Sequence, residues 1–428
     1  MNALAPSSAG RGWRGGWRDG LTYSSLGLPL AFVELPLYVL LPNHYASHYG
    51  VPLALLGAVL LAVRLLDAIA DPLIGRWADA LFARAPELAF RNLALAAIGL
   101  AIGFRALFFP PLEGERAPLL WCAGGLALTY LSFSTCMVIH QAWGARLAGN
   151  EVQRAQIVAW REGLALAGVM VASGLRTMTS LDWGTWVFTG LLLAGVVLLG
   201  RAPRSAPPRA RAEPVSMGLP WRTPAFRRLL AIYLFNGIAS AVPATLVLFF
   251  IQDRLQAADH QGLFLGSYFA AAAVAIPGWV RLVSRFGLAR TWLAAMLLAI
   301  VTFAWATQLG AGDVVGFTIV CLTSGVALGA DLTLPSAMLT GVIQRAGHGQ
   351  QAEGSYTGWW SFATKLNLAL AAGLALPALQ VFGYAAGVRD AGALAALSWA
   401  YCLLPCGLKL VAAALLYFRW IRLDPDRP

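Results

Sequence analysis

Three charged residues at helical spacing inside an apolar stretch are the best candidates for chemistry in this sequence. Arg64, Asp67 and Asp71 lie at positions i, i+3 and i+7, so a helix would place them on one face. A charged side chain at the centre of a bilayer costs about 2.5–3.5 kcal/mol, so such residues normally face a bundle interior or a water-filled cavity. The stretch therefore predicts a functional charge cluster, and Arg76 and Asp79 are expected to mark the exit of its helix into water.

Asp67 and Asp71 are one helical turn apart, which lets their carboxylates converge on one cation or share one proton. Hard cations such as Na⁺ prefer several oxygen ligands, and this pair would supply the anionic part of such a site. We therefore predict that the pair binds a cation, as metal ligands only if that cation is Na⁺, with Arg64 in the charge network. The alternative is that Arg64 neutralises the two carboxylates in a purely structural network.

Further polar residues interrupt other apolar stretches. Glu34 lies in the middle of the first stretch, where it would face a pore, and Asp331 lies near Pro335, where a broken helix would line a cavity. His140 would bind substrate, relay protons or form an interhelical hydrogen bond. Trp143 would stack on a substrate or pack within the protein.

The remaining charged candidates are Arg161, Glu162 and the two lysines of the chain. Arg161 and Glu162 are neighbours, so their side chains should leave a helix about 100° apart and should not face the same way. Lys365 lies within an apolar stretch, where it would bind substrate or balance the charge of the aspartate pair. Lys409 lies within snorkelling distance of the inner surface, which predicts a structural role.

The composition indicates an integral membrane protein. The 428-residue chain is 59% hydrophobic and 12% charged, with a mean hydropathy of +0.67, which excludes an ordinary water-soluble domain. Its net charge of +11 comes from arginines scattered between apolar runs, so we expect orientation in a lipid bilayer and no binding of nucleic acid. The five cysteines lie in apolar segments and lack the paired spacing of a zinc site.

Apolar stretches near twenty residues long predict twelve transmembrane helices. Their expected ranges are 21–42, 51–72, 90–110, 118–143, 157–178, 184–200, 227–251, 262–283, 289–309, 314–342, 356–382 and 391–420. With the amino terminus inside, 23 basic residues fall in cytoplasmic segments and 5 in outer segments, as the positive-inside rule requires. We therefore predict an all-α polytopic protein of the plasma membrane with both termini in the cytoplasm.

A segment rich in Pro and Arg divides the twelve helices into two sets of six, which is typical of a linker. The predicted organisation is a cytoplasmic tail at 1–20, a six-helix half at 21–200, a cytoplasmic linker at 201–226, a second six-helix half at 227–420 and a tail at 421–428.

Two six-helix halves joined by a basic loop resemble the major facilitator fold. The stretch RLLDAIADPLIG, which begins at Arg64, resembles the second-helix signature of the melibiose-carrier branch, the glycoside–pentoside–hexuronide:cation symporters, in which the motif runs R-x-x-D-A-x-x-D-P-x-x-G. LPLYVLLPNHY, WREGLALAG and SYTGWWSFATKLNLALAAG are further similarities in the first, fifth and eleventh helices. The resemblance implies that Asp67 and Asp71 form the coupling-cation site. It also implies that Arg161 binds substrate and that Lys365 corresponds to the family's eleventh-helix lysine.

The sequence departs from the family pattern around the cation site. The resemblance implies two further oxygen ligands, but the corresponding residues are Ala70 and Cys136, neither of which carries oxygen in its side chain. Ser132, Ser134 or Thr135 would have to substitute. This loss favours H⁺ over Na⁺, because a carboxylate alone suffices for a proton.

We therefore predict a secondary transporter, similar to sugar symporters, that couples a small solute to H⁺ or Na⁺ by alternating access, without a cofactor and as a monomer. The family's two sugar-binding carboxylates align with Ala31 and Ile139, which argues against a galactoside, whereas cationic Arg161 and Lys365 favour an anionic or zwitterionic solute. A lysophospholipid or other amphipathic lipid is the alternative substrate. A membrane-embedded enzyme or a passive channel is a remote alternative, since no H-E-x-x-H motif occurs, and neither lysine lies in a Walker-type sequence.

Overall fold

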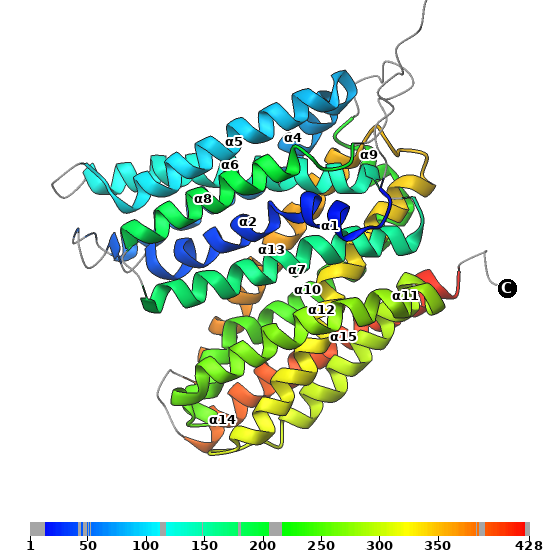
Figure 1. The fold of residues 1–428 in the computed structure, drawn as a ribbon. Coiled ribbons are helices and arrows are strands. Elements are labelled where there is room, and N and C mark those ends of the chain that lie inside the picture. The colour runs from blue at the N-terminus through cyan, green and yellow to red at the C-terminus, as the bar shows by residue number, and fades with distance from the viewer. Residues whose placement is uncertain are drawn as a thin grey trace, which may run out of the picture. The chain divides into compact units, whose positions relative to one another are not determined.

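The computed structural model is helical (Figure 1), and no β-strand occurs in the part of the chain that it describes. The described residues are 13–41, 44–45, 49, 51, 53–111, 117–147, 149–178, 181–204, 216–381, 383–384 and 390–423. Within these ranges, eight helical segments are long and apolar enough to cross a membrane. The prediction of an all-α polytopic membrane protein is therefore confirmed.

The chain divides into two compact units, and the division falls within the expected linker 201–226. The first unit comprises Met1–Leu219 with Ile343–Trp359, and the second comprises Pro220–Val342 with Trp360–Pro428. The segment 343–359 therefore belongs to the first unit, although the sequence placed it in the second half. Residues 205–215 of the expected linker lie outside the described part of the chain.

The helices of the first unit match most ends of the expected spans to within several residues, while the helix expected at 51–72 continues to Arg84. They are α1 (Trp17–Ser24), α2 (Gly27–Leu35), the π-helical turn η1 (Pro36–Leu40), α4 (Leu53–Arg84), α5 (Pro86–Phe108), α6 (Ala117–Leu147), α7 (Glu151–Met178) and α8 (Leu181–Leu199). The most extensive packing joins α5 to α6, α2 to α7 and α4 to α6. Pro72 lies inside α4 without ending it, so the charge cluster of that helix lies on continuous helical backbone.

The second unit contains the remaining expected spans. It is built from α10 (Pro224–Phe249) with η2 (Phe250–Arg254), η3 (Ala258–His260), α11 (Gln261–Ala306), α12 (Val314–Arg345) as far as Val342, α13 (Glu353–Val381) from Trp360 onwards, α14 (Ala391–Ser398), η4 (Trp399–Leu403), α15 (Leu404–Leu416) and η5 (Tyr417–Ile421). The short helix α9 (Leu219–Arg222) lies at the boundary. The expected spans 262–283 and 289–309 both fall in α11, where Gly287 has a positive φ of 75° that separates them.

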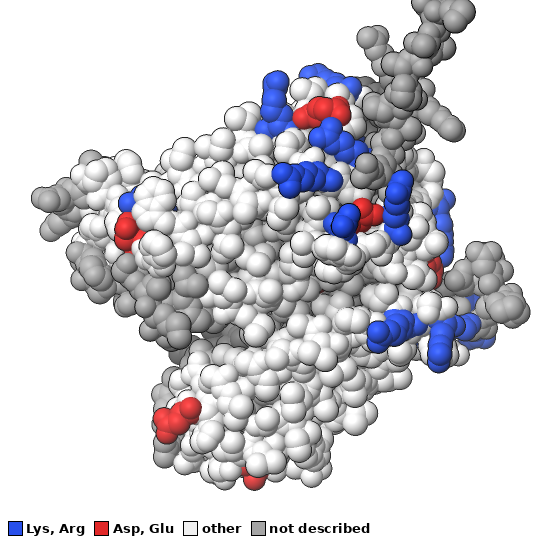
Figure 2. Space-filling view, in the orientation of Figure 1, with Lys and Arg blue, Asp and Glu red and all other residues white. Residues whose placement is uncertain are grey.

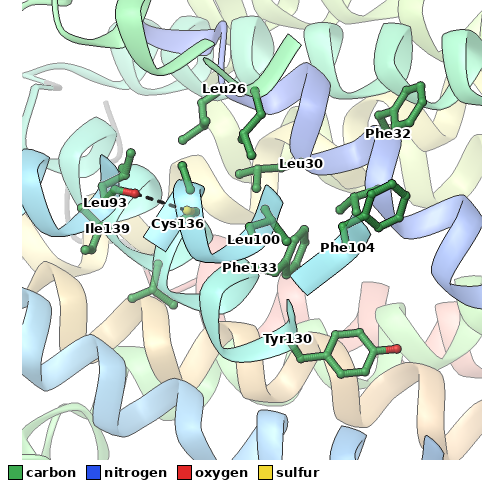
Figure 3. Packing of buried hydrophobic residues seen from close by; sticks show 14 of the residues in the cluster. Leu26, Leu30, Phe32, Leu93, Leu100, Phe104, Tyr130, Phe133, Cys136 and Ile139 are labelled. Atoms are coloured by element: carbon green, nitrogen blue, oxygen red, sulfur yellow. Dashed lines mark hydrogen bonds between the residues drawn. The ribbon is translucent and has the colours of Figure 1, made fainter. Parts of the chain in front are cut away.

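The core of the first unit is formed by the apolar faces of its helices. In Figure 3, side chains from the start of α2, from α5 and from α6 converge, including Leu30, Leu100, Phe104 and Phe133. Their burial supplies the main stabilisation between helices wherever side chains pack tightly. This core positions the polar face that α6 presents to α4.

Charged side chains lie mainly near helix ends. Figure 2 shows broad surfaces without charge along the helices, with Lys and Arg gathered close to the helix termini. This distribution suits helices whose middle turns contact lipid.

Candidate functional site

The carboxylates of α4 lie inside the first unit. Asp67 is 5% exposed and Asp71 is completely buried. Ser134 of α6 donates its hydroxyl to Asp67 Oδ1 at 2.6 Å. The short distance suits a charge-assisted hydrogen bond, so α6 contributes directly to the site that the sequence located on α4.

Ser134 is one of the three hydroxyl residues that the sequence left open as further ligands, and it is hydrogen-bonded to Asp67. The sulfur of Cys136, which stands where the family pattern has an oxygen ligand, instead donates to the Leu93 carbonyl at 3.6 Å (Figure 3). Because Cys136 lies two residues beyond Ser134, the two side chains leave α6 in different directions. In the described part of the chain, no group of three His, Cys, Asp or Glu side chains converges as a metal site.

Glu34 and Arg64 lie close to the same position. Glu34 is half-buried in α2, and Arg64 lies one turn before Asp67 on α4. Both residues, together with Asp67, act electrostatically on the hydroxyl of Tyr130 in α6. The charges of these three residues are thus within electrostatic range of one side chain of α6.

His140 and Trp143 are core residues in this arrangement. His140 is completely buried, its Nε2 lies 2.7 Å from the Tyr23 carbonyl, and the Tyr23 hydroxyl donates to the His140 carbonyl at 3.1 Å. The indole N–H of Trp143 donates to the Pro203 carbonyl at 2.9 Å, and the ring meets two phenylalanines edge to face. Of the alternatives open from the sequence, these contacts favour the packing roles for both residues over substrate binding.

Arg161 and Glu162 meet, although their side chains were predicted not to face the same way. Arg161 donates from Nε at 2.9 Å and from Nη2 at 2.7 Å to the same oxygen, Glu162 Oε1. Long flexible side chains bend around the helix, which compensates for the angle between their Cα–Cβ bonds. Because Glu162 neutralises it, Arg161 no longer supports an anionic substrate.

Asp331 of α12 is the centre of a polar cluster inside the second unit. Its Oδ1 accepts from Asn236 Nδ2 at 3.0 Å and from Trp292 Nε1 at 2.9 Å. Its Oδ2 accepts from Ser240 Oγ at 3.2 Å and from Lys409 Nζ at 2.7 Å. All four lone-pair directions of the carboxylate therefore have donors.

Lys409 does not extend to the inner surface, near which the sequence placed it with a structural role. Its side chain is 3% exposed, and besides pairing with Asp331 it donates to Asn236 Oδ1 at 2.8 Å. The cluster joins α10, α11, α12 and α15. Lys409 is thus a buried partner of the residue that the sequence had placed in a pore.

Lys365 also belongs to the second unit. It lies on α13, half-buried, next to Thr364, whose hydroxyl is 2.8 Å from the Tyr233 hydroxyl. The ring of Tyr233 stacks on Trp360 with centroids 3.9 Å apart. The charge balance between Lys365 and the aspartates of the first unit stays a prediction.

Asp79 forms a second buried cluster in the first unit that the sequence did not predict. It was expected at the exit into water, but it is 3% exposed. It accepts from the backbone N–H groups of Gly354 and Ser355 at 2.6 and 2.7 Å and from Arg146 Nη2 at 2.9 Å. The free N–H groups at the start of α13 thus bind this carboxylate, as helix N-termini bind anions.

Arg146 connects Asp79 with a second carboxylate. Its Nη2 lies 3.0 Å from Glu353 Oε2, and its guanidinium stands over the ring of Phe82 at 4.1 Å. One signal in the sequence was Gly75, one turn before Asp79. A Cβ at Gly75 would lie 2.1 Å from the Gly354 carbonyl oxygen, so only glycine permits this approach of α13 to α4.

Comparison with known proteins identifies the relatives of the chain. A family model described as MFS/sugar transport protein matches residues 22–424. The inner membrane symporter YicJ of Escherichia coli K12 is 23% identical over 296 residues, which cover 64% of this chain and 62% of that protein. The putative glycoside/cation symporter YagG of the same organism is 26% identical over 159 residues, covering 37% of this chain and 34% of that protein. The chain thus spans less than two thirds of the length of these relatives.

Solved structures share the fold at low sequence identity. A bacterial homologue of the iron transporter ferroportin, in an outward-facing state, has a TM-score of 0.73 at 15% identity and covers 96% of this chain and 100% of its own. The E. coli fucose:proton symporter FucP has a TM-score of 0.67 at 14% identity, with 94% and 98% covered. These similarities confirm the predicted fold.

Proposed function

The chain belongs to the MFS/sugar transport protein family, and on that premise we propose that it is a cation-coupled secondary transporter that moves a small solute by alternating access. The observation that carries this proposal is the buried pair Asp67 and Asp71 on α4, with the Ser134 hydroxyl on Asp67. A structural need would be met at less cost by apolar side chains. Two buried carboxylates in this position support reversible binding of a cation. The family consists of transporters rather than enzymes.

The ligand set favours H⁺ as the coupling ion. Two carboxylates and one hydroxyl provide fewer oxygens than Na⁺ usually takes in proteins, and Cys136 is turned toward Leu93. A proton needs only one carboxylate. Symport is supported by the names of the relatives YicJ and YagG.

The same face of α4 offers a route from cation binding to a change of conformation. Asp71, Gly75 and Asp79 recur every four residues, and α13 packs along them. A Cβ at Gly358 would lie 2.4 Å from the Asp71 carbonyl oxygen, so a shift of α4 on cation binding would act directly on the start of α13. A ligand that prefers one arrangement of this contact shifts the population toward it.

The substrate that fits best is a small polar solute of the sugar or glycoside class. Pairing with Glu162 neutralises Arg161, which removes one of the two cations that favoured an anion. Glu34 remains a carboxylate able to accept hydrogen bonds from hydroxyl groups. The glycoside named for YagG supports this class.

Cation-dependent thermal stability tests the proposal on the purified full-length protein. We expect the Tm to rise with the coupling cation, as Na⁺ at constant ionic strength or as H⁺ across pH, because a ligand stabilises the state that binds it. Asp67→Asn should abolish the response. Ser134→Ala should change the apparent affinity at least about tenfold, since a hydrogen bond to a charged group contributes about 1.5–3 kcal/mol. Na⁺ should bind more weakly because it loses an oxygen ligand, whereas H⁺ should bind more tightly because the donated hydrogen bond favours the ionised carboxylate.

Ser132→Ala is the matched control, because Ser132 is a buried serine two residues away on the same helix. It should leave the cation response unchanged. An Asp67→Asn variant with the same cation response as the wild type would contradict the assignment.

A further inference from the structure

The exposed charges in the described part of the second unit are separated by sign between its two ends. At the end where α10 begins and η5 ends, the exposed arginines include Arg227, Arg228, Arg281, Arg285, Arg419 and Arg422. At the opposite end, the exposed carboxylates are Asp259, Asp313 and Asp390. Figure 2 shows this separation on one face of the unit, with Asp and Glu near α14 and Lys and Arg near the end of α15.

The arginines at this end have no carboxylate partner among the described residues. In that part of the second unit, the one ion pair lies in the interior, between α12 and α15. The first unit differs, because two of its arginines that the sequence also predicts to be cytoplasmic are paired. Arg204 lies 2.9 Å from Glu87, and Arg345 lies 3.3 Å from Glu151.

The positive-inside rule explains arginines at a cytoplasmic end but not the lack of carboxylates among them. The rule depends on Lys and Arg, and Asp and Glu contribute little to it. Carboxylates between the arginines would also reduce the mutual repulsion of their charges. Exposed guanidinium groups without such partners are therefore suited to bind anions from outside the chain.

Exposed apolar side chains lie among these arginines. Phe286, next to Arg285 on α11, is 55% exposed, and Phe418 in η5 is 54% exposed. Because α11 contacts η5, the two segments form one surface. Leu404, Val411 and Phe418 are exposed at intervals of seven residues, so an apolar stripe runs along α15 toward the arginines. Such a stripe ending among arginines is typical of a surface at the level of lipid headgroups.

We propose that this end of the second unit binds the headgroups of anionic phospholipids. The guanidinium groups of α11 and η5 bind the phosphates, for which their planar fork is well suited, and the rings of Phe286 and Phe418 contact the upper part of the acyl chains. A soluble anion would neutralise the arginines but would leave both rings exposed. The inference does not rest on the proposed function, because it uses no residue of the cation site.

Lipid-dependent thermal stability of the purified full-length protein tests the inference. The protein in neutral detergent is titrated with mixed micelles that contain equal mole fractions of phosphatidylglycerol or phosphatidylcholine. We expect phosphatidylglycerol to raise the Tm more than phosphatidylcholine, because a bound lipid stabilises the folded state. The difference should shrink as KCl is added, since salt screens exposed charges.

Arg281→Gln/Arg285→Gln should weaken the apparent affinity for phosphatidylglycerol at least about tenfold, because each basic residue near an anionic surface contributes about fivefold. Both residues lie on α11, away from Asp424 and Asp426, which follow in the sequence after η5 and lie outside the described residues. Arg419→Gln/Arg422→Gln tests the same surface from η5 and should also weaken the affinity, should the first variant fold poorly.

Arg204→Gln/Arg345→Gln is the matched control, because it removes the same number of positive charges from arginines that already have carboxylate partners. It should change the affinity for phosphatidylglycerol less than about twofold, since exposed paired charges contribute little. Equal losses in the α11 and control variants would overturn the inference, because total charge would then be the cause.

Three further results would also overturn it. Equal stabilisation by the two lipids would show that apolar contacts suffice. The same stabilisation by inorganic phosphate would assign the arginines to a free anion, and the same stabilisation by polyglutamate would assign them to an acidic protein surface.

Discussion

Asp331→Asn is expected to leave little folded protein, because it leaves the buried ammonium of Lys409 without its counter-charge. Lys409 is 3% exposed and would keep only its bond to Asn236 as a polar partner of known geometry. Removing one partner of a buried ion pair costs about 3–5 kcal/mol, which is a large share of the stability of a typical protein. Lys409→Met should have a similar effect, since it leaves the carboxylate without its counter-charge. Monodisperse yield and Tm in detergent measure both variants.

The double variant Asp331→Leu/Lys409→Met tests whether the unpaired buried charge causes the loss of stability. Removing both charges should recover most of the lost stability, because apolar groups replace buried ion pairs at little cost. Asp313→Asn is a control in the same unit, since Asp313 accepts from Gly310 in an exposed loop. A stable Asp331→Asn protein whose transport changes its pH dependence would instead support the pore role that the sequence suggested.

Arg146→Met is the second substitution with a large expected effect. It leaves Asp79 and Glu353, both at most 3% exposed, without the cation that lies 2.9 and 3.0 Å from them. Two buried carboxylates would then repel each other, and we expect a loss of at least about 3–5 kcal/mol. Arg146→Lys should be intermediate, because an ammonium keeps the charge but lacks the planar fork. Thermal unfolding of the purified proteins tests whether stability falls from the wild type to Arg146→Lys and then to Arg146→Met.

Arg345→Met is the matched control for this cluster. The pair of Arg345 with Glu151 belongs to the same unit, but its side chains are 53% and 37% exposed and 3.3 Å apart. Exposed pairs contribute about 0–1 kcal/mol, so the Tm should hardly change. Equal losses in Arg146→Met and Arg345→Met would show that burial is not the cause.

The positions of the spans could be predicted because bilayer thickness and arginine distribution act on sequence alone. The expected ranges match the helices to within several residues, and the long extension of α4 to Arg84 lies past the expected end at 72. The break at Gly287 lies between two expected spans, but the π-helical segments were not predicted. Such segments depend on local backbone geometry, which a hydropathy pattern does not predict.

The placement of residues on one face of a helix was predicted better than contacts between residues of different helices. Helical spacing predicted that Asp67 and Asp71 share a face of one helix, whereas the bond between Asp67 and Ser134 depends on how α4 packs against α6. Asp331 and Lys409 are 78 residues apart in the chain. Their meeting depends on how two helices are rotated, which no local pattern determines.

The burial of Asp79 and Trp143 has a related cause. Both lie near helix ends, where sequence patterns predict contact with water or lipid headgroups. The start of α13 covers Asp79, and the chain after α8 covers Trp143. Such coverage comes from segments distant in sequence, so it emerges only in the folded chain.

Gradient-driven uptake by Asp71→Asn in proteoliposomes tests the central claim most directly. Radiolabelled glycosides would be offered under an imposed proton or sodium gradient, with substrate equilibration in the absence of a gradient as the control for folding. We expect the wild type to accumulate at least one of them above the outside concentration, and Asp71→Asn to equilibrate the same solute without accumulating it, because the variant lacks the carboxylate that binds the cation. Accumulation by Asp71→Asn to the wild-type level would contradict the account.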